Sequence, residues 1–325
     1  MKRRPLLLAA LAAPTLARAQ SAPPGAWPRE RPVRLVVTYP PGGTTDFVAR
    51  AFAQRLSEQL GQSVVVENRT GGGGAVGWGA VVRAAPDGYT LLVTDNSLAT
   101  APPLMPQLGF DPLADLTPVS LLVDYATVFV VPAELPARSW PEFLALSRRR
   151  GAGDVFYGSM GVGSSPHLYS ELLQDLAQVR MTHVPFRGMG PALTDLLAGR
   201  IQLLAAAPPT VLGALRGGTV RAIAVSTAGG RIPALPDVPT FRELGLDFTY
   251  SYWYGLLGPR GLEPAIAQRL DEEVRRALAA PGFRDRFIEQ GALPVAGNGE
   301  ALAATMRGEL ARWGELIRTK DIRLE

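Results

Sequence analysis

Two glycine-containing segments bring polar residues to the start of a predicted helix. The first comprises Pro41, Gly42, Gly43, Thr44, Thr45 and Asp46. Glycine lets a ligand approach the backbone closely, and the free N–H groups and dipole of a helix N-terminus favour an anion such as a carboxylate. Thr44 and Thr45 add hydroxyl donors, whereas Asp46 either braces the loop or meets an amine or hydroxyl of a ligand. The alternative is an ordinary glycine turn followed by a helix N-cap.

The second segment runs from Ser159 to His167 and belongs to the other half of the chain. Its candidate ligand contacts are Ser159, Gly163, Ser164, Ser165 and His167. The serine hydroxyls would donate to a second anionic group, and Pro166 suits a first helical turn. A well-capped helix is the alternative, and a helical histidine more often braces a loop than binds a ligand. Asn96 and Ser97, after a predicted strand, are further candidate contacts.

Other site chemistries find little support in the sequence. Gly72, Gly74 and Gly77 match a dinucleotide fingerprint, but three residues separate them from the preceding strand, so we reject a nucleotide site. The chain has no cysteine and two histidines, His167 and His183, with no metal-ligand spacing. No nucleophile-elbow motif is present. A Ser/His/Asp triad stays open, because its members need not be close in sequence. We expect no cofactor and no metal.

The segments that would position these residues alternate between strand and helix. Apolar, β-branched runs at 33–39, 63–67 and 89–94 predict buried strands, with helices expected at 44–60 and 75–85. The pattern resumes from strand 127–131 to strand 220–226, and residues 263–318 are mainly helical. Such alternation predicts an α/β fold with a mostly parallel sheet. Ligands bind such sheets at the carboxyl ends of strands, so two facing junctions would form a cleft.

The N-terminus predicts export. Four of the 33 basic residues and no acidic residue lie in positions 1–19, so the remaining chain carries 29 of each sign and is neutral. Lys2-Arg3-Arg4, a short apolar stretch and Ala17-Arg18-Ala19 are typical of a signal peptide cleaved near Ala19. The stretch is too short to span a membrane. We therefore expect a periplasmic monomer that binds no nucleic acid and inserts in no membrane.

Several longer strings resemble the Bug family, the periplasmic receptors of tripartite tricarboxylate transporters. The strings are Tyr39 to Asp46, Val64 to Arg69, Ala84 to Leu91, His183 to Gly188, Ala192 to Gly199 and Leu235 to Thr240. The resemblance extends from about Val33 to Ile322. It implies a periplasmic-binding-protein fold, with two Rossmann-like lobes joined by crossing strands around a ligand cleft. It also implies a small carboxylic acid as ligand, with the two glycine-containing segments forming the halves of the site.

The expected division is a signal peptide (1–19), a leader (20–32), lobe 1 (33–126 plus 227–325) and lobe 2 (127–226). The chain departs from the family where the strand after Gly199 ends without the usual Asp, so that Ala206 would form an apolar site wall. Leu98 and Ala101 also replace polar family residues. An ammonium group would lack a partner at these positions, which favours a carboxylate with an apolar body over a polar amino acid.

The leading hypothesis is a protein that captures a carboxylate and presents it to membrane transporter subunits. A ligand-sensing partner of a two-component sensor kinase would use the same kind of pocket, so the sequence leaves this alternative open. An esterase is a second alternative, and it would need an activated serine such as Ser159 or Ser164.

Overall fold

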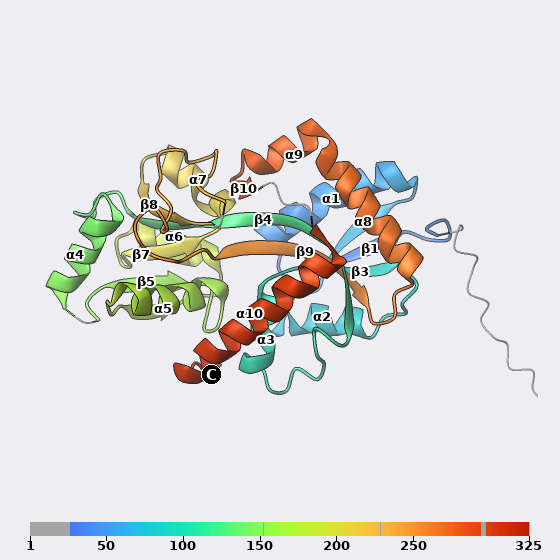
Figure 1. The fold of residues 1–325 in the computed structure, drawn as a ribbon, viewed down its shortest axis with the longest axis horizontal. Helices are drawn as coiled ribbons and strands as arrows, with labels where there is room; N and C mark the ends of the chain where they lie inside the picture. Colours follow the sequence, from blue (N-terminus) through green and yellow to red (C-terminus); the bar gives the residue numbers. More distant parts are fainter. Residues whose placement is uncertain (1–26, 152, 228, 294–296, 325) are drawn as a thin grey trace, which may run out of the picture.

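The computed structural model describes residues 27–151, 153–227, 229–293 and 297–324. The predicted signal peptide and the first part of the leader lie outside these residues. The chain forms two groups of strands and helices, and β4 (Leu116–Pro132) and β9 (Ser251–Pro259) run side by side between them (Figure 1). This is the two-lobed α/β fold that the sequence predicts.

The remaining elements follow the expected alternation. The strands are β1 (Val33–Val37), β2 (Val64–Asn68), β3 (Thr90–Asp95), β5 (Phe156–Ser159), β6 (Thr182–Pro185), β7 (Leu203–Ala206), β8 (Val220–Ser226), β10 (Ala292–Leu293) and β11 (Gly297–Asn298). The helices are α1 (Thr44–Leu60), α2 (Ala75–Val82), α3 (Ser97–Leu104), α4 (Trp140–Arg150), α5 (Ser165–Ala177), α6 (Met189–Leu197), α7 (Pro208–Arg216), α8 (Pro264–Ala279), α9 (Pro281–Ile288) and α10 (Gly299–Thr319). A short 3₁₀ turn, η1 (Gly72–Gly74), precedes α2.

Each lobe contains a small parallel sheet, and antiparallel strands connect the two. In one lobe β1 pairs in parallel with β2 and β3, and in the other β5 pairs in parallel with β6 and β7. β9 is antiparallel to β3 and β4, and β4 is antiparallel to β7 and β8. The sequence predicted a mostly parallel sheet, but the sheet is mixed. The reason is that the two crossing strands, β4 and β9, run antiparallel to each other and to the strands beside them.

β4 changes partner in its middle. Its pairing with β9 ends at Ala126, opposite Ser251, and its pairing with β8 begins at the next residue, Thr127, opposite Ser226. One 17-residue strand thus belongs to both lobes. We keep residue 126 as the proposed boundary between the lobes on the basis of this change.

Helix α10 also spans the two lobes (Figure 1). Its first part packs on α3 and β4, and its last turns reach α5. Trp313 is fully buried there, with its ring 5.3 Å from that of Tyr169. Just beyond the helix, Lys320 Nζ lies 2.6 Å from Asp175 of α5. The C-terminal helix therefore connects the lobes by apolar packing and by an ion pair.

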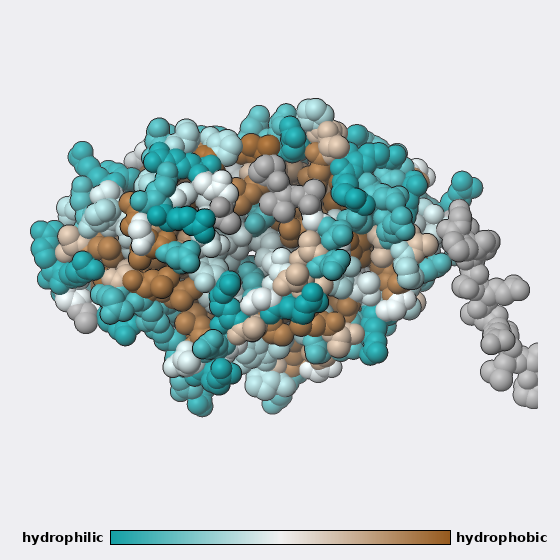
Figure 2. Space-filling model, viewed as in Figure 1, coloured by the Kyte–Doolittle hydropathy of each residue, from teal (hydrophilic) through white to brown (hydrophobic). Residues whose placement is uncertain are grey.

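The surface is mainly hydrophilic on the face shown in Figure 2, where hydrophobic residues are visible in small groups between hydrophilic ones. Among the described residues, no helix combines the length and the apolar character that a membrane crossing requires.

Candidate ligand-binding site

A cavity of about 1060 Å³ lies between the lobes. Both glycine-containing segments contribute to its wall, together with the ends of β3 and β7 and one face of β9. From the segments predicted by sequence, the lining residues are Pro41, Gly42, Gly43, Thr44, Thr45, Asn96, Ser97, Gly163, Ser164 and Ser165. This volume is at the upper end of the roughly 300–1,000 Å³ typical of small-molecule sites. A small acid would therefore leave space for water unless the lobes close further.

Five helices begin at this cavity, namely α1, α3, α5, α6 and α7. The N-cap or first-turn residues of all five are among the lining residues. No side chain caps α1, α5 or α6, whereas α7 begins with Pro208 and Pro209, which have no N–H, and the first N–H of α3, that of Ser97, donates to Asp95. The first N–H groups of a helix have no intrahelical acceptor, and the helix dipole adds positive potential there. None of the described lining residues is Lys, Arg or His. Backbone groups therefore supply most of the attraction for an anion.

The first loop is held in shape by Asp46. Gly42 has a φ of +91°, a conformation that favours glycine, and its N–H donates to Asp46 Oδ2 at 3.0 Å. Arg50 and Asn68 also donate to this carboxylate. Burial acts to raise the pKa of Asp46, but these hydrogen bonds outweigh it and hold the pKa below its usual value. Asp46 does not line the cavity, and its contacts brace the loop.

Asp95, at the end of β3, organises the neighbouring hydroxyls. The hydroxyls of Ser97 and Thr45 both donate to its carboxylate, and Tyr39 Oη lies 3.4 Å from its Oδ1. The backbone N–H of Ser97 donates to Oδ1 at 3.0 Å. Burial raises the pKa of Asp95, and the hydrogen bonds oppose that rise. The protons of Thr45 and Ser97 point to Asp95, and Tyr39 Oη donates to Ser97 Oγ at 2.8 Å, so neither hydroxyl has a proton left for a ligand.

The serine hydroxyls of the second loop are also engaged within the protein. Ser164 Oγ donates to the carbonyl oxygen of Gly161 at 2.7 Å, and Ser165 Oγ donates to Asn96 Oδ1 at 3.1 Å. A hydroxyl has a single proton, so neither serine has a proton left for a ligand in this arrangement. The expected hydroxyl donors therefore act mainly to order the loop, and the α5 N-terminus is left to attract an anion.

Behind this loop, buried His167 and half-buried His183 support its backbone. The rings of His167 and His183 stack with centroids 3.9 Å apart. His167 Nδ1 accepts from the N–H of Gly163 at 2.9 Å, and His183 Nε2 is hydrogen-bonded to Ser159 Oγ at 2.6 Å. Burial lowers the pKa of His167 to about 4, and burial followed by the charge of His167 lowers the pKa of His183 to about 3. Both rings are therefore neutral at neutral pH.

The two lobes touch at the entrance to α5. Gly163 has a φ of +76°, and a Cβ atom at this position would lie 2.3 Å from Leu104 Cδ1 of α3. Asn96 Nδ2 donates to the hydroxyl of Tyr169, which in turn donates to the carbonyl oxygen of Ser251 on β9. Asn96 thus contacts both the crossing strand and the second loop.

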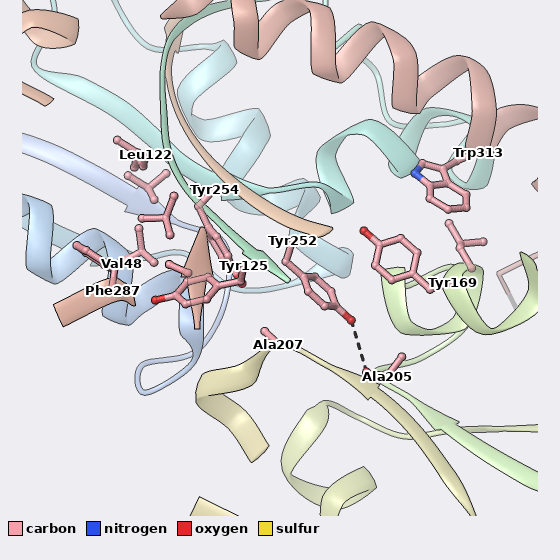
Figure 3. Close-up of a cluster of buried hydrophobic side chains, with 14 of the residues drawn as sticks. Val48, Leu122, Tyr125, Tyr169, Ala205, Ala207, Tyr252, Tyr254, Phe287 and Trp313 are labelled. Atoms are coloured by element: carbon pink, nitrogen blue, oxygen red, sulfur yellow. Dashed lines mark hydrogen bonds between the residues drawn. The ribbon is translucent and has the colours of Figure 1, made fainter. Parts of the chain in front are cut away.

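The crossing strand β9 forms the floor of the cavity. Tyr252 and Tyr254 lie on the same face of the strand, since side chains alternate along it, and both line the cavity. The Tyr252 hydroxyl donates to the carbonyl oxygen of Ala205 on β7 at 3.4 Å, which joins β9 to the second lobe (Figure 3). Trp253 points to the opposite face and donates to the buried carboxyl of Glu309 at 2.8 Å.

Four predicted site residues lie behind the cavity surface. They are Asp46, Ser159, His167 and Ala206. Asp46, Ser159 and His167 brace the loops, and fully buried Ala206 is replaced in the lining by its neighbour Ala207. Ligand contact by any of the predicted residues stays a prediction.

The cavity also has lining residues that the sequence did not indicate, among them Tyr39, Asp95, Leu104, Met105, Met160, Val162, Gly188, Met189, Gly190 and Thr210. The α6 N-terminus at Gly188 had a sequence signal, a glycine at a strand–helix junction. Among the described residues, no group of three His, Asp or Glu side chains is placed to hold a metal ion.

Comparison with known proteins identifies the family. Residues 48–322 match the model of the "Tripartite tricarboxylate transporter family receptor". The chain is 36% identical to Protein BugT of Bordetella pertussis over 298 residues, which cover 91% of each chain.

Solved structures agree with this match. Rpa4515 of R. palustris, determined with adipate, is 34% identical, covers 92% of this chain and 100% of its own, and superposes with a TM-score of 0.84. MatC (Rpa3494) of Rhodopseudomonas palustris, with bound malate, is 34% identical, covers 89% and 99%, and gives a TM-score of 0.79. The family match and the shared two-lobed architecture show that this chain belongs to the Bug-type receptors of tripartite tricarboxylate transporters.

Proposed function

We propose that the cavity between the lobes captures a small carboxylic acid for delivery to a tripartite tricarboxylate-type membrane transporter. The convergence of three uncapped helix N-termini, those of α1, α5 and α6, on a cavity without basic lining side chains carries this proposal. Such an arrangement attracts an anion through backbone N–H groups and helix dipoles. Two similar solved structures are described with bound malate and with adipate, which are both dicarboxylates.

The carboxylate would dock at the α1 N-terminus. Gly43, Thr44 and Thr45 line the cavity there, and Asp46 fixes the loop from behind. The second loop, at the α5 N-terminus, would then cover the ligand from the other lobe. Because β4 and β9 connect the lobes, bending of these strands would be the hinge for closure.

A transporter is favoured over a sensor kinase as the partner, because the matching family is described as a transporter receptor. We also propose that the protein has no enzymatic activity. Ser159 hydrogen-bonds to His183, but it is fully buried and lies outside the cavity surface, so a substrate carbonyl would not reach it. The receptor would act as a monomer in the periplasm after cleavage near Ala19.

A panel of carboxylic acids tests the proposal. Binding to the native state raises the thermal midpoint by mass action, so the true ligand should shift the unfolding curve in a concentration-dependent way. Isothermal titration calorimetry of the acids that produce a shift would give their affinities. If no mono-, di- or tricarboxylate shifts the midpoint at millimolar concentration, the carboxylate assignment is wrong.

A further inference from the structure

Asp95 is the one acidic or basic side chain among the described residues that line the cavity. Its exposed fraction is 7%, and it lies where β3 meets α3, next to the α1 loop. Ala206, Leu98 and Ala101 offer no partner to an ammonium group, but Asp95 does. Leu98 is fully buried and does not line the cavity. The anionic partner for such a ligand is therefore present at the end of β3, with β9 and β4 between it and β7, where the family pattern placed it.

The two carboxylate oxygens of Asp95 carry unequal numbers of hydrogen bonds. Oδ1 accepts from the N–H and hydroxyl of Ser97, and the Tyr39 hydroxyl, which donates to Ser97 Oγ at 2.8 Å, lies 3.4 Å away. Oδ2 accepts only from the hydroxyl of Thr45, over a long 3.4 Å. A carboxylate oxygen has two lone-pair sites, so Oδ2 has the capacity for a second and shorter hydrogen bond.

The charge of Asp95 also lacks a compensating cation. All of its hydrogen-bond partners are neutral, and no Lys, Arg or His is among the described lining residues. Burial of an unpaired charge is costly, and buried charges in proteins are usually paired. A second carboxylate placed beside Asp95 would be repelled, whereas a protonated amine would compensate the charge.

We propose that Asp95 Oδ2 binds a protonated amine of the ligand, so that the receptor prefers a zwitterionic amino carboxylate with an apolar body. This inference rests on the proposed function, because the ligand carboxylate would lie at the neighbouring helix N-termini. The apolar body would contact the other wall, to which Leu104, Met105 and Met160 contribute. Methionine side chains are flexible and polarisable, and they adapt to apolar groups of varied shape.

Matched ligands isolate the role of the amine. The first pair is adipate and 6-aminohexanoate, which both have six carbons and differ in that a protonated aminomethyl group replaces one carboxylate. The second pair is 4-methylpentanoate and leucine, which is the same acid with an added α-amine. We expect the wild-type protein to bind at least one amine-bearing compound about tenfold or more tightly than its matched acid in calorimetric titrations. Equal or weaker binding of the amine-bearing compound in both pairs, or no binding of any of the four, would overturn the inference.

Variants then test whether Asp95 causes the preference. Asp95→Asn keeps the shape of the side chain but removes its charge, and it should reduce the affinity ratio within a pair to near one. Asp271→Asn is the matched control, because Asp271 is 6% exposed, is paired with Arg275 and lies on α8 outside the cavity. It should leave the ratio unchanged. Retention of the preference in Asp95→Asn, or in Asp95→Ser if the first variant does not fold, would contradict the assignment.

The two proposals fail in different ways. If the protein binds adipate or 4-methylpentanoate but gains nothing from the amine, the role of Asp95 is wrong and carboxylate capture stands. If no acid in the wider panel binds, with or without an amine, the proposed function itself is wrong.

Discussion

Ser165 and Asn96 are joined by a hydrogen bond of 3.1 Å, although 69 positions separate them in the chain. Ser165 begins α5 in one lobe, and Asn96 precedes α3 in the other. Asn96 also donates to Tyr169, four residues further along α5. The position of the second loop is thus set by a residue of the opposite lobe, within the wall of the ligand cavity.

Replacement of Ser165 by alanine should therefore affect both stability and ligand binding. It leaves the Asn96 Oδ1 atom buried without its hydroxyl donor, which typically costs about 1–3 kcal/mol. Urea unfolding and calorimetry with the acid that gives the largest thermal shift would measure the two effects. Ser170→Ala is the control, because the Ser170 hydroxyl bonds within α5 to the carbonyl oxygen of Pro166. If both variants bind ligand equally, the bond between the lobes has no role in binding.

Gly163→Ala should prevent the close approach of the lobes. The new methyl group would adopt a φ of +76° and would lie 2.3 Å from Leu104 Cδ1, so either α3 or the second loop must move. Strain of this kind costs about 1–3 kcal/mol, and ligand affinity should fall at least tenfold if the lobes must close at this point. Calorimetric titration measures the affinity.

Gly199→Ala separates backbone strain from the clash. Gly199 has a φ of +70°, but no atom lies within 4 Å of a Cβ atom placed there. This variant should lose stability with little change in affinity. An affinity for Gly163→Ala as high as that for Gly199→Ala would argue against contact at Gly163 during binding.

The sequence predicted the elements whose boundaries depend on local signals. Helix α1 has the predicted bounds, because Gly43 and Gly61 limit it at both ends. Helix α3 was missed because Pro102 and Pro103 lie inside it, and the first half of β4 was missed because Pro118, Ser120 and Asp124 interrupt its apolar run. These elements form because long-range pairing and packing outweigh the local preference.

In the candidate site, too, local features were predictable from the sequence and features that depend on distant residues were not. Glycine-containing junctions are visible in sequence, so both loops of the cavity were found. The direction in which a hydroxyl donates depends on acceptors that are distant in sequence, as for Thr45 with Asp95 or Ser165 with Asn96. Asp95 was not predicted as a ligand contact, since its burial beside the cavity arises from the packing of α1 against β3.

Glu309→Gln should stabilise the protein at neutral and alkaline pH. Burial raises the pKa of Glu309 to about 8, so the native state keeps a proton that the unfolded state loses above about pH 4.5. The free energy of unfolding therefore falls as pH rises between these values, by up to ~1.4 kcal/mol per pH unit from this group. Glutamine retains an acceptor for Trp253 without the charge. Urea unfolding at pH 5, 7 and 9 should show an advantage of the variant that grows with pH, and a constant difference would contradict the shift.

The histidine pair should destabilise the native state as pH falls, and His183→Gln should remove part of that contribution. The native pKa values of His167 and His183 are about 4 and about 3, below the ~6.5 of an unfolded chain. The unfolded state therefore binds more protons, and stability is lost as pH falls below about 6.5, by up to ~1.4 kcal/mol per pH unit for each ring. Asp124 and Glu309, whose pKa values burial raises to about 6 and about 8, act in the opposite direction in this window, but both are common to the two proteins. In urea unfolding between pH 8 and 4, the stability difference between wild type and variant should therefore be constant above about pH 7.5 and should change in favour of the variant below about pH 6.5, by up to ~1.4 kcal/mol per pH unit. Equal slopes below pH 6 would show that His183 is not held neutral by the fold.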